Sequence, residues 1–154
     1  MGSFGDLLSD DNKKLIVSAT VQIGEVYRMH LTDKEGVKPK KTGDDGRDKY
    51  FIVLGIDEDI AVGAILINTN INENLPVYLK NLHYPLNVSD YPFLKQNRYA
   101  CCDDLKSIDM KIFAKLFKKP KGIINYDDLD LIKGAVASSP ISTPKILKQF
   151  GLIT

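Results

Sequence analysis

The fold of this chain is decided by residues 46 to 72, GRDKYFIVLGIDEDIAVGAILINTNIN, which contain two apolar runs. The first run extends from Tyr50 to Ile56 and the second from Ile60 to Ile67, and three acidic residues separate them. Each run is short, continuous and rich in Ile and Val, which is typical of a strand buried on both faces. Because three residues are too few for a crossover, the runs are predicted to pair as an antiparallel hairpin.

Polar residues stand at both outer ends of this hairpin. Arg47 and Lys49 precede the first run, and Asn68, Thr69 and Asn70 follow the second. The two outer ends of an antiparallel hairpin come back side by side. A pair of cations and a group of hydroxyl and amide side chains are therefore expected to share one rim of a sheet, and this rim is the candidate site.

The segment before the hairpin, Thr32 to Asp48, is expected to be a loop because Gly and Pro residues interrupt it. It carries acidic residues together with the cations Lys38, Lys40 and Lys41. A mixed run of this kind is most often a solvated loop. The alternative is a basic flap over a polyanion, because loops set on a rigid sheet commonly carry binding residues.

The remaining chain predicts a single domain over residues 21–154, preceded by an extension, residues 1–20, with a short helix. Ile23 to Leu31 and Arg98 to Leu105 are expected to be strands, and His30 is interpreted as an exposed strand residue rather than a catalytic base. Helices are expected at 110–117, after an Asn125 cap and after Thr143-Pro144. Around Pro76 and Pro85 the sequence favours edge strands or irregular turns. Strands first and helices last indicate an α+β fold: a small antiparallel sheet or partly open barrel with C-terminal helices packed against it.

Composition excludes several classes of protein. The chain has 154 residues, of which 44% are hydrophobic and 27% charged, as in a globular domain. No apolar run approaches the roughly 18 residues that span a bilayer. With a formal net charge of +1, an anionic partner must be attracted by a local patch. Cys101 and Cys102 are neighbours, which disfavours a disulfide between them and indicates a cytoplasmic location. Two distant histidines and this cysteine pair are too few for a tetrahedral zinc site, so no metal or cofactor is expected.

Several segments in order resemble the MazF/PemK family of toxin ribonucleases. Gly24-Glu25-Val26-Tyr27 is similar to the first strand opening of the family, and a basic residue then leads into an apolar strand at residues 47–54. The next strand ends in 68–70, where the family has a pair of hydroxyl residues. Residues 99–109 are similar to the family's strand followed by a basic, small, apolar and acidic segment. The chain departs from the family at Arg47, which Asp48 and not proline follows, and at Asn70.

The resemblance implies an SH3-like barrel with appended helices, often a homodimer, that cleaves single-stranded RNA without a metal and is inhibited by a small antitoxin protein. Arg47, Lys49 and Thr69 would then be the catalytic residues. Arg47 and Thr69 would stabilise charge on the phosphate, and Lys49 would transfer a proton. RNA-binding residues would be Lys38, Lys40, Lys41, Asn68 and Asn70. The alternatives are a catalytically lapsed barrel that binds nucleic acid or a protein, and a structural module of a larger assembly.

Overall fold

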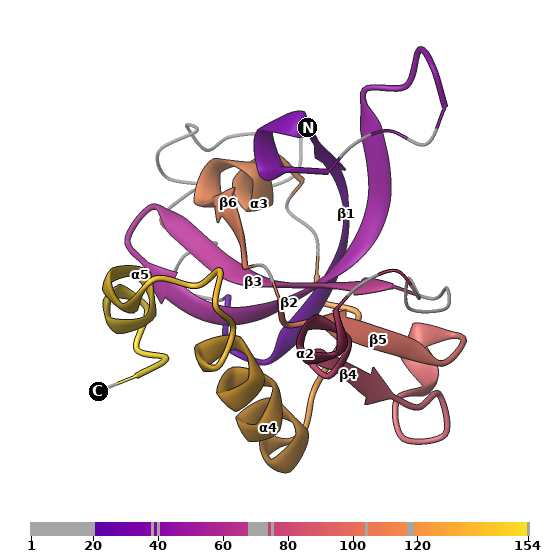
Figure 1. Ribbon diagram of the computed structural model, residues 1–154. Coiled ribbons are helices and arrows are strands. Elements are labelled where there is room, and N and C mark those ends of the chain that lie inside the picture. Colours follow the sequence, from indigo (N-terminus) through magenta and orange to yellow (C-terminus); the bar gives the residue numbers. More distant parts are fainter. Residues whose placement is uncertain are drawn as a thin grey trace.

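The computed structural model describes residues 21–37, 39, 41–67, 74, 76–103, 105–116 and 119–153. A curled antiparallel sheet runs through these residues, and a few helices pack on it (Figure 1). The strands are β1 (Glu25–Thr32), β2 (Gly46–Asp57), β3 (Ile60–Ile67), β4 (His83–Leu86), β5 (Arg98–Cys101), β6 (Lys106–Asp109) and β7 (Gly122–Ile123). The helices are η2 (Asp33–Glu35), α2 (Val77–Lys80), η3 (Pro92–Leu94), α3 (Met110–Leu116), α4 (Tyr126–Ala137) and α5 (Pro144–Gln149). The fold class is therefore α+β, as predicted.

The predicted hairpin is confirmed as β2 and β3, which pair antiparallel from Tyr50 opposite Leu66 to Asp57 opposite Ile60. The sheet order is β4-β5-β3-β2-β1-β7. β3 has β2 on one side, while its other side pairs with β6 along Ile60 to Gly63 and with β5 at its end. The hairpin is thus the centre of the sheet, and the described strands add to it on both sides.

Side chains from the hairpin fill two separate cores, one on each face of its strands. Tyr50, Ile52 and Leu54 belong to a cluster that also contains residues of α4 and α5. Phe51 and Val53 belong to a second cluster, which contains residues of α3. Figure 1 shows α3 and α4 on opposite sides of β2 and β3. Burial on both faces, which the continuous apolar runs predicted, follows from helices covering each side.

The two C-terminal helices begin where their capping residues predict. The Asn125 side chain accepts a hydrogen bond from the backbone N–H of Asp128 at 2.9 Å, and α4 follows. The Thr143 hydroxyl accepts from the N–H of Ile146 at 3.3 Å, and Pro144 is the first residue of α5. These contacts satisfy donors that the first turn of a helix otherwise leaves unpaired.

Two sequence expectations are wrong in detail. β2 begins at Gly46, so the loop expected up to Asp48 ends earlier, because these charged residues still pair their backbones with β1. The strand expected from Arg98 to Leu105 ends at Cys101 in a turn. Neither proline lies in a central strand, in agreement with the expectation of edge strands or irregular turns: Pro76 is irregular and precedes the short helix α2, and Pro85 lies on the edge strand β4. Among the described helices, none is long and apolar enough to cross a membrane.

Candidate functional site

Arg47 and Lys49 lie within β2 and not before it. Arg47 pairs with Leu31 of β1 and Lys49 with Met29, and both side chains are half-buried. Successive residues of a strand point to opposite faces, so Arg47 and Lys49 share one face and Asp48 lies on the other. The structure therefore brings these two predicted residues together. Their predicted partners Asn68, Thr69 and Asn70 lie outside the described residues, as do Lys38 and Lys40.

A hollow of about 410 Å³, which we call the loop-end hollow, lies at the start of β2 and is lined by His30, Lys41, Asp44, Asp45, Gly46, Arg47 and Asp48. Two of the predicted residues, Arg47 and the exposed Lys41, thus border the same space. Three aspartates line it as well. Its charge is therefore mixed, in contrast to the basic flap that the lysines of this loop suggested.

His30 lies between two of these carboxylates. Its Nδ1 is 2.9 Å from Oδ1 of Asp48, and its Nε2 is 2.7 Å from Oδ1 of Asp45. The hydrogen bonds to Asp48 and then to Asp45 raise the pKa of His30, and the bond from His30 lowers the pKa of Asp45. An imidazole with an acceptor at each nitrogen favours the doubly protonated form. We therefore interpret His30 as a cationic bridge between β1 and the start of β2.

A second group of polar residues, which we call the arginine cluster, was missed by the sequence reasoning. It consists of Arg28 of β1, Tyr50 of β2 and Arg98 of β5. The Arg98 guanidinium carbon lies 4.4 Å from the centroid of the Tyr50 ring, and that of Arg28 lies 5.2 Å from it. Both contacts are within the range of cation–π attraction. Two cations from distant parts of the sequence therefore meet on one aromatic ring.

Arg98 is unusual because it is charged and only 9% exposed. Its Nε donates a hydrogen bond to the backbone oxygen of Leu94 at 3.0 Å. Within the part of the chain that the structure describes, no carboxylate forms an ion pair with Arg98 or Arg28. Burial is the main cause that lowers the pKa of Arg98; Tyr50 opposes this shift, and the charge of Arg28 adds to it. Buried charges are ordinarily paired, so this cluster is a place where an anion would relieve the repulsion between two cations.

The arginine cluster and the catalytic candidates lie on opposite faces of β2. Tyr50 is in register with Arg28, and Asp48 with His30, so these four residues share the face opposite to Arg47 and Lys49. A single small anion on one side of the sheet cannot contact both the arginine cluster and the pair of Arg47 and Lys49. An extended polyanion that passes over the end of β2 can contact the two groups with different phosphates.

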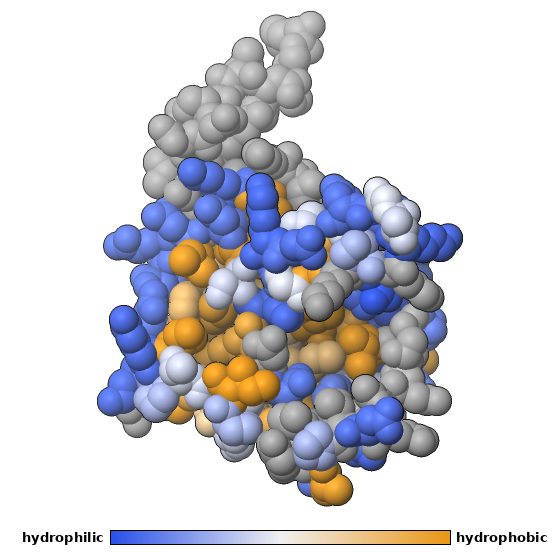
Figure 2. Space-filling model, turned by 45° about the horizontal axis from the view of Figure 1, so that its top comes forward, coloured by the Kyte–Doolittle hydropathy of each residue, from blue (hydrophilic) through white to orange (hydrophobic). Residues whose placement is uncertain are grey.

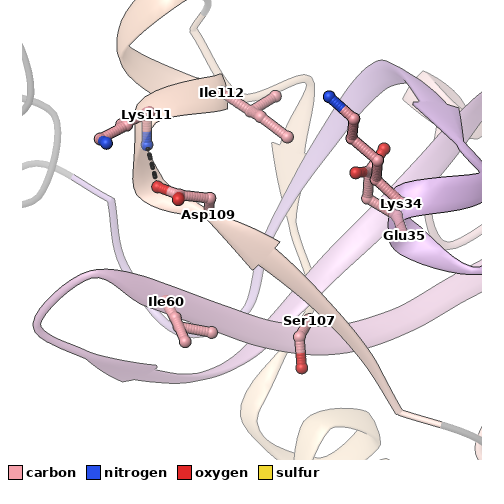
Figure 3. Close-up of a pocket in the computed structure, with 7 residues that line it drawn as sticks. All are labelled: Lys34, Glu35, Ile60, Ser107, Asp109, Lys111 and Ile112. Atoms are coloured by element: carbon pink, nitrogen blue, oxygen red, sulfur yellow. Dashed lines mark hydrogen bonds between the residues drawn. The ribbon is translucent and has the colours of Figure 1, made fainter.

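A second hollow, of about 430 Å³, lies beside β6 and contains no predicted site residue (Figure 3). It is lined by Lys34, Glu35, Ile60, Ser107, Asp109, Lys111 and Ile112. The Asp109 carboxylate accepts a hydrogen bond from the backbone N–H of Lys111 at 2.9 Å, which caps the start of α3. Equal numbers of lysines and acidic residues give this hollow no preference for one sign of charge. Figure 2 shows hydrophilic residues bordering a central apolar area on the face that it presents.

Comparisons of the chain with models of known protein families, with curated proteins and with solved structures find no match.

Proposed function

We propose that this protein is a toxin-like, metal-independent endoribonuclease that cleaves single-stranded RNA, with an SH3-like barrel as in the MazF/PemK family. The observation that carries the proposal is the arginine cluster, because two guanidiniums without a carboxylate partner among the described residues form a site for a phosphate. The side-by-side placement of Arg47 and Lys49 on β2 supports it. An inhibitory antitoxin protein, a homodimeric assembly and a cytoplasmic location belong to the same proposal.

The reaction in this proposal is attack of a ribose 2′-oxygen on the adjacent phosphorus. The new oxygen–phosphorus bond forms as the bond to the 5′-oxygen breaks, which leaves a cyclic phosphate and a 5′-hydroxyl end. Arg47 would stabilise the negative charge that develops on phosphorus, and Lys49 would carry a proton between the two oxygens. Thr69 would add a hydroxyl donor. Arg28 and Arg98 would hold a neighbouring phosphate of the same strand.

A second candidate function is that of a catalytically lapsed barrel that binds nucleic acid or a protein. The loop-end hollow favours it, since three aspartates line the hollow together with Arg47 and Lys41. Carboxylates near Arg47 repel a phosphate by the same Coulomb interaction through which the arginine attracts it. The departure at Asp48 from the arginine–proline pair of the family is consistent with this alternative.

The deciding experiment is cleavage of an unstructured RNA by the purified full chain in EDTA. We expect the wild type to release products that end in a cyclic phosphate. Arg47→Ala should lower the rate by roughly two to three decades, the usual scale for the loss of a preorganised donor, and Lys49→Ala should also lower it. Lys145→Ala removes an exposed cation on α5 and is the control. No cleavage by wild type, with RNA binding retained, would favour the lapsed barrel, and equal cleavage by all folded variants would exclude this catalytic site.

A further inference from the structure

Three side chains with metal-ligating atoms converge where β4 pairs with β5. His83 lies directly opposite Cys101 in this antiparallel pair, and Asp103 follows in the turn after β5. An imidazole nitrogen, the thiol sulfur and a carboxylate oxygen all lie within 4.8 Å of one another. All three residues are half-buried. The cluster is thus neither a solvated surface group nor part of the core.

The pairing of the strands explains why these residues meet. Their neighbours Tyr84 and Ala100 contact the core that contains α4. Because side chains alternate along a strand, His83 and Cys101 point to the opposite face. Residues directly opposite each other have Cβ atoms about 5 Å apart, so their side chains can reach a common ion between them. Counting histidines and cysteines along the sequence gave too few ligands, because a cross-strand pair with a carboxylate leaves no local motif.

We propose that His83, Cys101 and Asp103 form a Zn²⁺ site with one open coordination position. Thiolate and imidazole ligands together favour zinc over magnesium or calcium. With zinc bond lengths of about 2.0–2.3 Å in tetrahedral geometry, ligand atoms are about 3.3–3.7 Å apart. The ligand atoms lie within 4.8 Å of one another, so small side-chain rotations bring them into that range. Three protein ligands and one water molecule complete the coordination.

The site goes beyond the proposed nuclease function and is independent of it. β3 separates β5 from β2, the strand that carries Arg47 and Lys49. Bound zinc would tie the edge strand β4 to the turn after β5, and it would take no part in RNA cleavage. Removal of zinc should therefore lower stability without abolishing cleavage. Failure of one proposal is in this way distinguishable from failure of the other.

The test uses the full chain, stripped with a chelator and then titrated with Zn²⁺ or with Co²⁺ alone. Co²⁺ should produce a thiolate-to-metal charge-transfer absorption, and Zn²⁺ should abolish it by displacement. Zinc at about a hundred times its dissociation constant should raise Tm by about 5–10 °C. Cys101→Ser, His83→Asn and Asp103→Asn should each weaken binding by at least about 100-fold, because loss of an outer-shell partner alone costs 10- to 100-fold. His30→Asn, at the other histidine, is the matched control and should leave binding unchanged.

Alkylation of the wild type provides a measurement that needs no variant. Cys102 is fully buried and serves as the internal reference, whereas Cys101 is half-buried. Zinc should slow alkylation of Cys101 by about tenfold or more, as located by mass spectrometry. The proposal would be overturned if no charge-transfer absorption develops, if Cys101→Ser retains it, or if zinc leaves the alkylation of Cys101 unchanged.

Discussion

Replacing Arg28 by Met is the most informative perturbation of the arginine cluster. Arg28 is exposed, and its guanidinium carbon lies 5.2 Å from the centroid of the Tyr50 ring. A cation–π contact at an exposed position contributes about 0.5–1 kcal/mol. For a chain of this size, the substitution should lower Tm by only about 1–4 °C. Arg98 is a poorer probe because its removal also breaks the buried hydrogen bond to Leu94, so lost binding and lost folding would be confounded.

The expected effect on RNA binding is much larger. A hydrogen bond to a charged group contributes about 1.5–3 kcal/mol, so the loss of one phosphate contact should weaken affinity by about 10- to 150-fold. The slope of log affinity against log salt should fall by about 0.7, the value for one contact on a single strand. Fluorescence anisotropy of a labelled single-stranded RNA over a series of salt concentrations measures both quantities.

Lys145→Met is the matched control, because it removes an exposed cation from α5. It should change neither the affinity nor the slope beyond the small effect of one net charge. Equal affinities and slopes for the Arg28→Met, Lys145→Met and wild-type proteins would refute the inference that the arginine cluster binds phosphate. A fall in affinity without a change in slope would indicate an altered shape of the site rather than a lost ionic contact.

Two further predictions concern the charge bridge and the hairpin. The pKa of His30 is raised above its ordinary value of 6.5, so its stabilising contribution is complete below that pH and is lost as pH rises through the folded value. The pKa of Asp45 is lowered from 3.8, so its contribution is lost as pH falls through the folded value. The Tm difference between wild type and His30→Asn should therefore be largest between about pH 4.5 and 6 and should vanish in alkali. A Tm difference that does not change with pH would contradict the ionic bridge of His30. Gly63→Ala should lower the free energy of unfolding by about 3 kcal/mol or more, because the added Cβ would lie 1.9 Å from the Ile52 oxygen. Gly134→Ala should raise it by about 0.5–1 kcal/mol, because the added methyl group meets open space on α4 and alanine favours a helix. Denaturant unfolding measures both changes. Equal stabilities of these two variants would contradict the observed pairing of β2 with β3.

The central hairpin and the last two helices were predictable because their signals are local. Continuous Ile and Val runs indicate strands covered on both faces, and Asn125 and Thr143 satisfy the donors of the helices that follow them. The start of β2 was not predictable from polarity. Arg47 and Asp48 form part of the strand because their backbones pair with Leu31 and His30, and charged side chains do not prevent that pairing.

The candidate site was only partly predictable, because only part of it has a local signal in the sequence. Arg47 and Lys49 are two positions apart on one strand, so a sequence can suggest that they lie together. Arg28 and Arg98 come from strands far apart along the chain, and only the curl of the sheet brings them to Tyr50. Their single signal in the sequence is an arginine within each of two apolar strands, which has no fixed spacing that could identify it.

The two-sided burial of β2 and β3 has a consequence for how the strand register is specified. In a sheet with one wet face, a slip of one residue exposes the apolar side chains, and hydrophobicity alone forbids it. Here the same slip would exchange the Tyr50, Ile52 and Leu54 set with the Phe51 and Val53 set between two dry cores. The register of β2 against β3 must therefore depend on side-chain volume, above all on the lack of a side chain at Gly63, which lies against the Ile52 oxygen. It must also depend on the register shift that occurs along β2 between Val53 and Gly55. Substitutions that equalise residue sizes on the two faces should consequently produce a mixture of alignments rather than an unfolded chain.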